Sequence, residues 1–349
     1  MLRFNPTIAS EKVPVVVVCG IGTQSKTGTV ERILATGSGW AVISNEAKGP
    51  EFASAITERV VGQMVPHAIG CLCCVTRSGL VSSLRRVYAM RGQGIVAFDQ
   101  VLIECLPDTD PAPVMQTLLN NALVTEYFRL DSVIVAMGND DDMAHLPSSQ
   151  YGFKQVAVAD RIVVDPIALT TSAAIEALGR LAPAASLFAA DDPALSKAVL
   201  GAGLETRLLA GDLSAWLAAP HYFASDELER GLHGFAIELD EPLEWDAFHG
   251  WLNAGTQSNG DVMYRTKGAL RIHGLDEPVV INGAQHVYQP PYVVSDISIR
   301  HSRLLFITDD LDRAAVESSL RDDLPQFARL SQARAARVAR AALDPSLPL

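Results

Sequence analysis

One stretch constrains the fold of this chain more than any other, and it reads VVVVCGIGTQSKTGT from Val15 to Thr29. Four consecutive valines and Cys19 predict a fully buried β-strand, because the run is too short for a helix and is bounded by glycines. The chain then turns at Gly20 and Gly22, and we expect a helix to open at the Lys-Thr pair that follows. A buried strand, a glycine turn and a helix in this order are typical of a phosphate-binding loop.

The segment GIGTQSKT matches the P-loop pattern GxxxxGK[ST] except at Ser25, which replaces the last glycine. In such a loop the backbone amides face an anion, the lysine reaches the β- and γ-phosphates, and the hydroxyl holds Mg²⁺. We therefore expect GTP or another nucleoside triphosphate to bind here with Mg²⁺, which Thr27 would ligate. The expected binding residues are Gly20, Gly22, Thr23, Gln24, Ser25, Lys26 and Thr27. The alternative is an ordinary helix start, since Lys-Thr pairs are common.

Composition excludes several classes of function. With 349 residues the chain is long enough for two domains, and its net charge of -12 argues against a general binder of nucleic acid or anionic membranes. No apolar run of about eighteen residues predicts a membrane span, and the N-terminal residues lack the features of a signal peptide. Five cysteines, an odd number, indicate a reducing compartment. We expect a cytoplasmic protein.

Apolar segments with the spacing of strands alternate with helical segments over the first two thirds of the chain. This alternation predicts an α/β fold with right-handed crossovers and a mostly parallel sheet that is covered on both faces. We expect a short strand followed by a polar loop over 39–49, and further strands at 95–104, 132–137 and 156–164. The expected helices are 51–64, 79–90, 113–122 and 170–181, followed by an Ala-rich helical segment to about 224.

The composition changes near Arg230. Beyond it, short apolar strands surround one helix at 245–252 and precede another at 312–320, which predicts a small α+β domain with an antiparallel sheet. We expect a P-loop domain over 1–225, the α+β domain over 230–322 and a helical tail over 323–349. The arginines of this tail indicate a solvated helix face rather than a basic binding surface.

A set of short motifs in a fixed order points to one family. The most specific is Gly70-Cys71-Leu72-Cys73-Cys74, which matches a GCxCC signature. The supporting matches are Asn45-Glu46, Ile103-Glu104 with Asp110-Pro111, Gln155 with Ala159-Asp160-Arg161, Arg265-Thr266-Lys267-Gly268, and 305–312. From residue 13 to 320 the chain resembles the CobW family of P-loop GTPases, which handle metals or help to mature metalloenzymes.

The resemblance implies that Cys71, Cys73 and Cys74 bind zinc or another divalent transition metal. Three thiols within four residues suit a soft or borderline ion, and the alternative is that they are small buried hydrophobes. The resemblance also gives Glu104 a water-mediated contact to Mg²⁺, so Glu104 and Lys26 are the expected catalytic residues. It further implies a client metalloprotein as partner, with the nucleotide acting as a conformational switch. The sequence leaves open which metal and client are involved, and whether the protein forms a homo-oligomer.

The chain departs from the family at the positions that sense the nucleotide. Ser25 stands where backbone approaches phosphate closely, and Pro107 replaces a glycine whose N–H contacts the γ-phosphate. Pro166 and Ala168 replace the Lys and Asp of the guanine-reading NKxD motif. The sequence therefore predicts weakened nucleotide binding and hydrolysis. The alternatives are a pseudo-GTPase that acts as a metal- and client-binding scaffold, and an NTPase indifferent to the base.

Overall fold

The valine-rich strand is β1 (Val13–Gly20), and it lies inside an eight-stranded sheet with the order β4-β3-β2-β5-β1-β6-β7-β8. The structure is a computed structural model that describes residues 12–35, 39–44, 57–60, 63–66, 77–107, 109–138, 146, 149, 151–164, 178, 182, 185–200, 232–260, 262–294, 298–309 and 311–324. The six strands from β2 to β8 in that order run parallel, and β3 and β4 are added antiparallel at one edge. The predicted mostly parallel sheet is confirmed.

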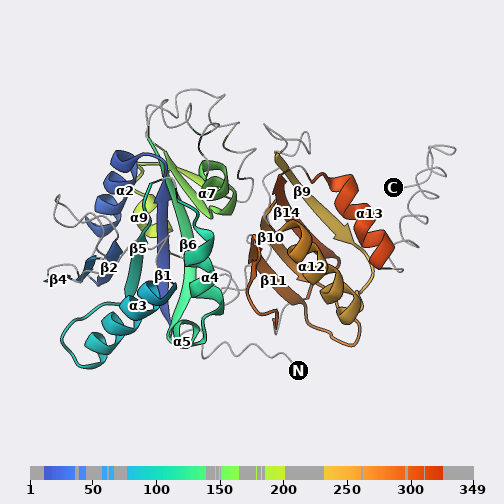
Figure 1. Ribbon diagram of the computed structural model, residues 1–349, viewed down its shortest axis with the longest axis horizontal. Helices are drawn as coiled ribbons and strands as arrows, with labels where there is room; N and C mark the ends of the chain where they lie inside the picture. Colours follow the sequence, from blue (N-terminus) through green and yellow to red (C-terminus); the bar gives the residue numbers. More distant parts are fainter. Residues whose placement is uncertain are drawn as a thin grey trace.

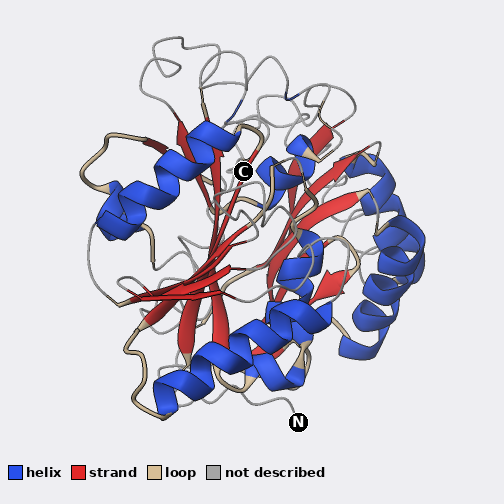
Figure 2. Ribbon diagram, turned by 60° about the vertical axis from the view of Figure 1, so that its left-hand side comes forward, coloured by secondary structure: helices blue, strands red, loops and turns tan. Residues whose placement is uncertain are grey.

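The elements of this first domain alternate along the chain. Its other strands are β2 (Trp40–Ser44), β3 (Thr57–Val60), β4 (Gln63–Pro66), β5 (Gln100–Glu104), β6 (Phe128–Met137), β7 (Arg161–Val164) and β8 (Ser186–Ala189). Its helices are α2 (Thr23–Ala35), α3 (Arg77–Gly92), α4 (Ala112–Asn120), α5 (Ala122–Thr125), α7 (Gly152–Val158) and α9 (Leu195–Ala198). Helices flank the strands on both sides, as Figure 2 shows.

Alternate residues of β1 supply two separate hydrophobic cores. Val15, Val17 and Cys19 pack in the core under α3, α4 and α7, whereas Val16 and Val18 pack under α2. Each of these five side chains is fully buried. An uninterrupted apolar strand is stable only where both sheet faces are covered, which explains why the sequence shows no alternation here.

The second domain is an antiparallel sheet with the order β12-β11-β10-β14-β9, in which β13 also pairs with β11. Its strands are β9 (Leu232–Leu239), β10 (Met263–Leu270), β11 (Val279–Ala284), β12 (Val287–Tyr288), β13 (Tyr292–Val293) and β14 (Ser302–Asp309). Its helices are α12 (Trp245–Asn259) and α13 (Arg313–Asp323). Both helices pack on one face of this sheet, around Phe248, Trp251 and Leu320. The predicted antiparallel α+β domain is confirmed.

The opposite face of the second sheet lies against the first domain. Figure 1 shows α4 and α7 on the side of the first sheet that faces β10 and β11. The side chains of Tyr264, Ala284, Val287 and Ile307 belong to the same hydrophobic core as α3 and α4. The second domain therefore buries both faces of its sheet, one on its own helices and one on its neighbour.

Several predicted elements differ from those observed. Residues 156–164 divide into the end of α7 and the strand β7, because a short apolar run has no periodicity that separates helix from strand. Within the predicted helix 51–64 the structure has β3 and the start of β4, and within the predicted helical segment to 224 it has β8. Helix α2 begins at Thr23 rather than at Lys26. Most of 170–181 and all of 325–349 lie outside the described residues.

In the described part of the chain, no helix combines the length and the apolar character that crossing a bilayer requires.

Candidate nucleotide and metal site

The carboxyl ends of β1, β2 and β5 meet at one edge of the first sheet. Val18 on β1 and Ser44 on β2 both lie beside Glu104, the last residue of β5. Two residues after β1, the chain enters α2. Gly20 fits the end of β1 because a Cβ there would lie 2.6 Å from the carbonyl oxygen of Ala136 on β6. This arrangement places the N-terminus of α2 over the strand ends, where anions bind in open α/β sheets.

Lys26 extends from the first turn of α2 into this edge and is fully buried. Its Nζ donates to the carbonyl oxygen of Cys105 at 2.5 Å and lies 3.7 Å from Oε1 of Glu104. The other carboxylate oxygen of Glu104 accepts a hydrogen bond from Oγ of Ser44 at 2.6 Å. The two residues expected to be catalytic are thus brought together, and Glu104 is a buried carboxylate rather than a solvent-facing one.

The residues of the glycine loop form the first turn of α2. Thr23 and Gln24 are exposed, and Thr27 is half-buried. The N–H of Lys26 donates to the carbonyl of Gly22 at 3.2 Å, so this amide is used within the helix. The first amides of a helix point outward from its N-terminus, which is where anions bind. The hydroxyl of Ser25 donates to Gly22 O at 3.0 Å, which directs its side chain back to the backbone.

Cys19 and Cys105 lie against each other beneath Lys26, and both thiols are free and buried. A hydrogen bond with Cys105 and the burial of the group raise the pKa of Cys19 well above its ordinary value, against a smaller opposing effect of Lys26. Because a neutral thiol is a poor nucleophile and metal ligand, the pair is part of the hydrophobic core.

A short turn connects β5 with α4, and we call residues 106, 107, 109 and 110 the post-β5 turn. The hydroxyl of Thr109 donates to the carbonyl of Leu106 at 2.8 Å. Pro107 is half-buried within the turn and has no N–H to offer a ligand. At the end of the turn, Oδ1 of Asp110 accepts a hydrogen bond from the N–H of Ala112, the first residue of α4.

The expected metal ligands Cys71, Cys73 and Cys74 lie outside the described residues, as do Pro166 and Ala168. In the part of the chain that the structure describes, no three His, Cys, Asp or Glu side chains are grouped so that they could hold a metal ion. The metal site therefore stays a prediction from the sequence.

Sequence reasoning missed the polar contacts between the two domains. Asp160, the residue before β7, lies with Oδ1 3.5 Å from Nη2 of Arg265 and 3.4 Å from Nζ of Lys267, both on β10. Its other oxygen accepts the N–H of Val133 at 2.9 Å. All three charged side chains are buried, and burial lowers the pKa of Arg265 while Asp160 opposes the shift. The motif matches contained these residues, but nothing in the sequence indicated that they face one another.

Comparison with known families agrees with this architecture. Residues 14–189 match the family described as CobW/HypB/UreG, nucleotide-binding domain, and residues 232–324 match the cobalamin synthesis protein cobW C-terminal domain. The chain belongs to the CobW family. The two CobW family matches fall on the two sheets that the structure describes.

Two curated members of the CobW family are similar in sequence. The chain is 24% identical to the zinc chaperone YjiA of Escherichia coli over 283 residues, which are 79% of this chain and 87% of YjiA. It is 27% identical to the zinc-regulated GTPase metalloprotein activator 1 of Schizosaccharomyces pombe over 176 residues. That second match covers 47% of this chain and 41% of the yeast protein.

Solved structures of the E. coli relative share the fold. The Zn(II)-bound YjiA GTPase superposes with a TM-score of 0.67 at 20% identity, covering 89% of this chain and 98% of YjiA. A Zn(II)-bound triple mutant of YjiA gives a TM-score of 0.68 at 19% identity with the same coverage. At such identity the likeness establishes the two-domain fold of this CobW family member.

Proposed function

We propose that this protein is a CobW-type metal-handling protein, a metallochaperone or maturation factor for a client metalloprotein. A nucleoside triphosphate with Mg²⁺ binds at the N-terminus of α2, and a divalent ion such as zinc binds at Cys71, Cys73 and Cys74. The nucleotide acts as a conformational switch for the metal. The free buried thiols of Cys19 and Cys105 suit a reducing, cytoplasmic environment.

The observation that carries the nucleotide part is the buried ammonium of Lys26. Its hydrogen-bond acceptor is a backbone carbonyl at the end of β5, and its carboxylate neighbour, Glu104, is 3.7 Å away and held by Ser44. A phosphate beside the first turn of α2 offers this ammonium a charged partner at short range. The residues therefore fit an anionic ligand: the amides of the first helical turn bind it, and Lys26 neutralises its charge.

Magnesium and catalysis have partial support from the same residues. Thr27 follows Lys26 and is half-buried. Its hydroxyl would ligate the Mg²⁺ that accompanies the phosphates. The ion would neutralise charge on the phosphates when it is bound. Glu104 would hold a water molecule of that ion, and Ser44 orients the carboxylate for this role.

The metal part rests on the thiol cluster in the sequence and on the relatives. Three cysteines within four residues match the ligand preference of zinc and other thiophilic ions. The two curated relatives carry the words zinc chaperone and zinc-regulated metalloprotein activator in their names. A metal-handling role with a client metalloprotein accounts for both observations.

A scaffold without hydrolysis is the second candidate, and two observations favour it. Pro107 lies in the post-β5 turn, where it cannot donate an N–H to a γ-phosphate. Helix α2 begins at Thr23, so the amide of Lys26 is engaged by Gly22 instead of facing a ligand. Such a protein would keep the fold and the metal and would bind its client without turning over nucleotide.

Calorimetry separates these candidates. GTP, ATP and their slowly hydrolysed analogues are titrated with Mg²⁺ into metal-free and zinc-loaded protein. We expect micromolar binding that is lost in Lys26→Met and kept in the matched control Lys267→Met, and stoichiometric zinc binding that is lost in the Cys71→Ser/Cys73→Ser/Cys74→Ser variant. Zinc binding without nucleotide binding would establish the scaffold. If zinc binds equally to wild type and the triple variant, the metal proposal is wrong.

A hydrolysis assay completes the comparison. Phosphate release is measured for wild type, Pro107→Gly and the Ser25→Gly/Pro107→Gly double variant. Release by the double variant alone would show that the natural chain binds nucleotide but lacks the means to hydrolyse it.

A further inference from the structure

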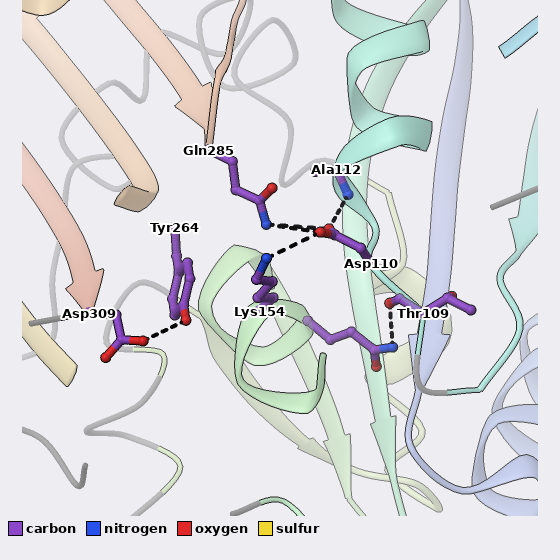
Figure 3. A network of polar contacts seen from close by, with 8 residues as sticks. Thr109, Asp110, Ala112, Lys154, Tyr264, Gln285 and Asp309 are labelled. Atoms are coloured by element: carbon purple, nitrogen blue, oxygen red, sulfur yellow. Dashed lines mark hydrogen bonds and ion pairs between the residues drawn. The ribbon is translucent and has the colours of Figure 1, made fainter. Parts of the chain in front are cut away.

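Asp110 lies where three segments of the chain meet. Figure 3 shows its carboxylate between the first turn of α4, Lys154 of α7 and Gln285 of the second domain. Its Oδ1 accepts the N–H of Ala112 at 2.9 Å, and its Oδ2 is 3.5 Å from Nζ of Lys154. The amide of Gln285 donates to both oxygens at 3.3 Å. One carboxylate thus joins the post-β5 turn to the second domain.

Gln285 holds a backbone conformation that is unusual for a residue with a side chain. It lies between β11 and β12 with φ at 53°, and it is the one non-glycine residue of the described chain in the left-handed region. Such a conformation costs about 1 kcal/mol or more for a residue with a side chain and is normally given to glycine. Gln285 is nonetheless buried, with its N–H donating to the carbonyl of Met263 at 3.0 Å. The two-residue connection between β11 and β12 accounts for the positive φ, and glutamine adds to it the side chain that reaches Asp110.

Helix α7 holds the same turn from a second direction. The fully buried Gln155 donates from Nε2 to the carbonyl of Thr109 at 2.8 Å. The ammonium of Lys154 lies 6.0 Å from the ring of Tyr264 on β10, whose hydroxyl donates to Asp309 at 2.9 Å. Lys154 therefore contacts both the post-β5 turn and the second domain. Together with Gln155 it holds the turn from the side of α7.

The other end of this turn adjoins the phosphate loop. The turn begins directly after Cys105, and both Cys105 and Glu104 contact the ammonium of Lys26. The N–H of Cys105 donates to the carbonyl of Val18 at 2.9 Å, so the start of the turn is fixed to β1. When Lys26 exchanges the Cys105 carbonyl for a phosphate, the residue that directly precedes the turn loses its contact with Lys26.

We propose that Asp110 and Gln285 are positioning residues that connect the phosphate loop to the second domain. Nucleotide binding draws Lys26 away from Cys105, the post-β5 turn shifts, and the contact between Asp110 and Gln285 opens. The hairpin of β11 and β12 then leaves its place against α4. This inference rests on the proposed nucleotide binding and names the residues through which the switch reaches the second domain.

The test is hydrogen exchange of the full-length protein, read on peptides that cover 279–293. The variant is Gln285→Gly, which removes the side chain and suits the left-handed backbone, so the fold is retained. The matched control is Gln257→Ala, at an exposed position of α12. We expect Mg·GTP to increase exchange in the hairpin of wild type and control. In Gln285→Gly the exchange is already increased and does not respond to nucleotide.

The affinity of the variants for Mg·GTP is the second measurement. Because the contact holds the nucleotide-free arrangement, Gln285→Gly and Asp110→Asn are expected to bind Mg·GTP about fivefold more tightly than wild type, in the range of ordinary coupling between sites. Nucleotide binding with unchanged hairpin exchange in wild type, or wild-type affinity in both variants, would overturn the proposed connection while leaving the proposed function intact.

A third measurement is made without nucleotide. Lys26→Met also frees the Cys105 carbonyl, so it is expected to increase hairpin exchange in the absence of any ligand. If wild type binds no nucleotide and Lys26→Met still changes the hairpin, the connection between the two regions stands and the nucleotide proposal fails. If Lys26→Met leaves the hairpin unchanged, the connection is wrong.

Discussion

Two buried lysines of this protein face buried carboxylates, and their surroundings differ. Lys26 lies at the edge of the first sheet, 3.7 Å from Glu104 and bound to the carbonyl of Cys105 at 2.5 Å. Lys267 lies between the domains, 3.4 Å from Asp160. Both side chains are almost completely inaccessible to solvent. Burial alone therefore does not distinguish a lysine that serves the fold from one that serves a ligand.

The difference lies in the segments that hold the partners. Asp160 faces Lys267 and Arg265 on one strand, and its other oxygen binds the N–H of Val133 in β6. Rearranging this cluster would separate two sheets. The acceptor of Lys26 is the carbonyl of Cys105, which lies between the end of β5 and the post-β5 turn and carries no charge. A buried ammonium that binds a neutral carbonyl gains more from an anionic ligand than one already paired with a carboxylate at its domain interface.

The largest effect is expected from Asp160→Ala. The substitution leaves the cations of Arg265 and Lys267 buried at the domain interface without this carboxylate, which is expected to cost about 3–5 kcal/mol. Denaturant unfolding measures the loss. The control is Asp240→Ala, at an exposed carboxylate 3.0 Å from His301, which should change stability by less than about 0.5 kcal/mol. Equal effects of the two variants would show that the Asp160 cluster does not stabilise the interface.

The same substitution at both lysines sharpens the comparison directly. Lys26→Met leaves the buried carboxylate of Glu104 without its cation and should cost about 2 kcal/mol, with at least a roughly tenfold loss in Mg·GTP affinity. Lys267→Met leaves Asp160 its pairing with Arg265 and should cost less than about 1 kcal/mol, with affinity unchanged. Unfolding and calorimetry give both values. A similar loss of affinity in the two variants would show that Lys26 is no closer to a ligand site than Lys267.

Ser44→Ala tests how firmly the carboxylate end of the Lys26 site is held. The variant removes the 2.6 Å hydrogen bond to Oε2 of Glu104, and a bond to a charged group is worth about 1.5 kcal/mol. Ser258→Ala, at an exposed position of α12, is the control and should cause no loss. A destabilisation of Ser44→Ala no larger than that of the control would show that Glu104 is not anchored by β2.

The smallest effect concerns alkaline pH and the thiol beneath Lys26. The pKa of Cys19 is raised by its hydrogen bond to Cys105 and by burial, so above about pH 9 the unfolded thiol loses a proton that the folded thiol keeps. Stability therefore falls as pH rises through this range, by at most about 1.4 kcal/mol per pH unit from this group. Unfolding free energies of Cys19→Ala should fall less steeply than those of wild type. Parallel profiles would contradict the assignment.

The sequence predicted the architecture where its signals were strong. The valine strand, the alternation after it and the short strands beyond Arg230 predicted a mostly parallel sheet and an antiparallel one, but not the edge strands β3, β4 and β8. It failed where local patterns are ambiguous: residues 156–158 belong to α7, although their apolar run was read as a strand. The loop before Lys26 was expected to stay open, whereas the helix begins at Thr23, since nothing between Thr23 and Lys26 prevents helical backbone.

The candidate site was predictable in part for the same reason. Lys26 and Glu104 could be named because each belongs to a motif next to a strand, and the structure brings them together. Ser44 and Gln285 could not be named, because their roles depend on neighbours that are distant in the chain. Gln285 carries no signal at all in the sequence, since a left-handed backbone at a glutamine is visible only in three dimensions.

The shared hydrophobic core has a consequence for how the chain is made. Tyr264, Ala284, Val287 and Ile307 come from the second domain yet pack in the core of the first. During synthesis the first domain leaves the ribosome with this apolar surface uncovered, and it stays so until the last of these four residues has been added. A nascent chain that stalls between the two domains therefore exposes the apolar surface that the second domain would cover. Because exposed apolar surface promotes aggregation of incomplete chains, a chain that stalls there is expected to aggregate more readily than a finished one.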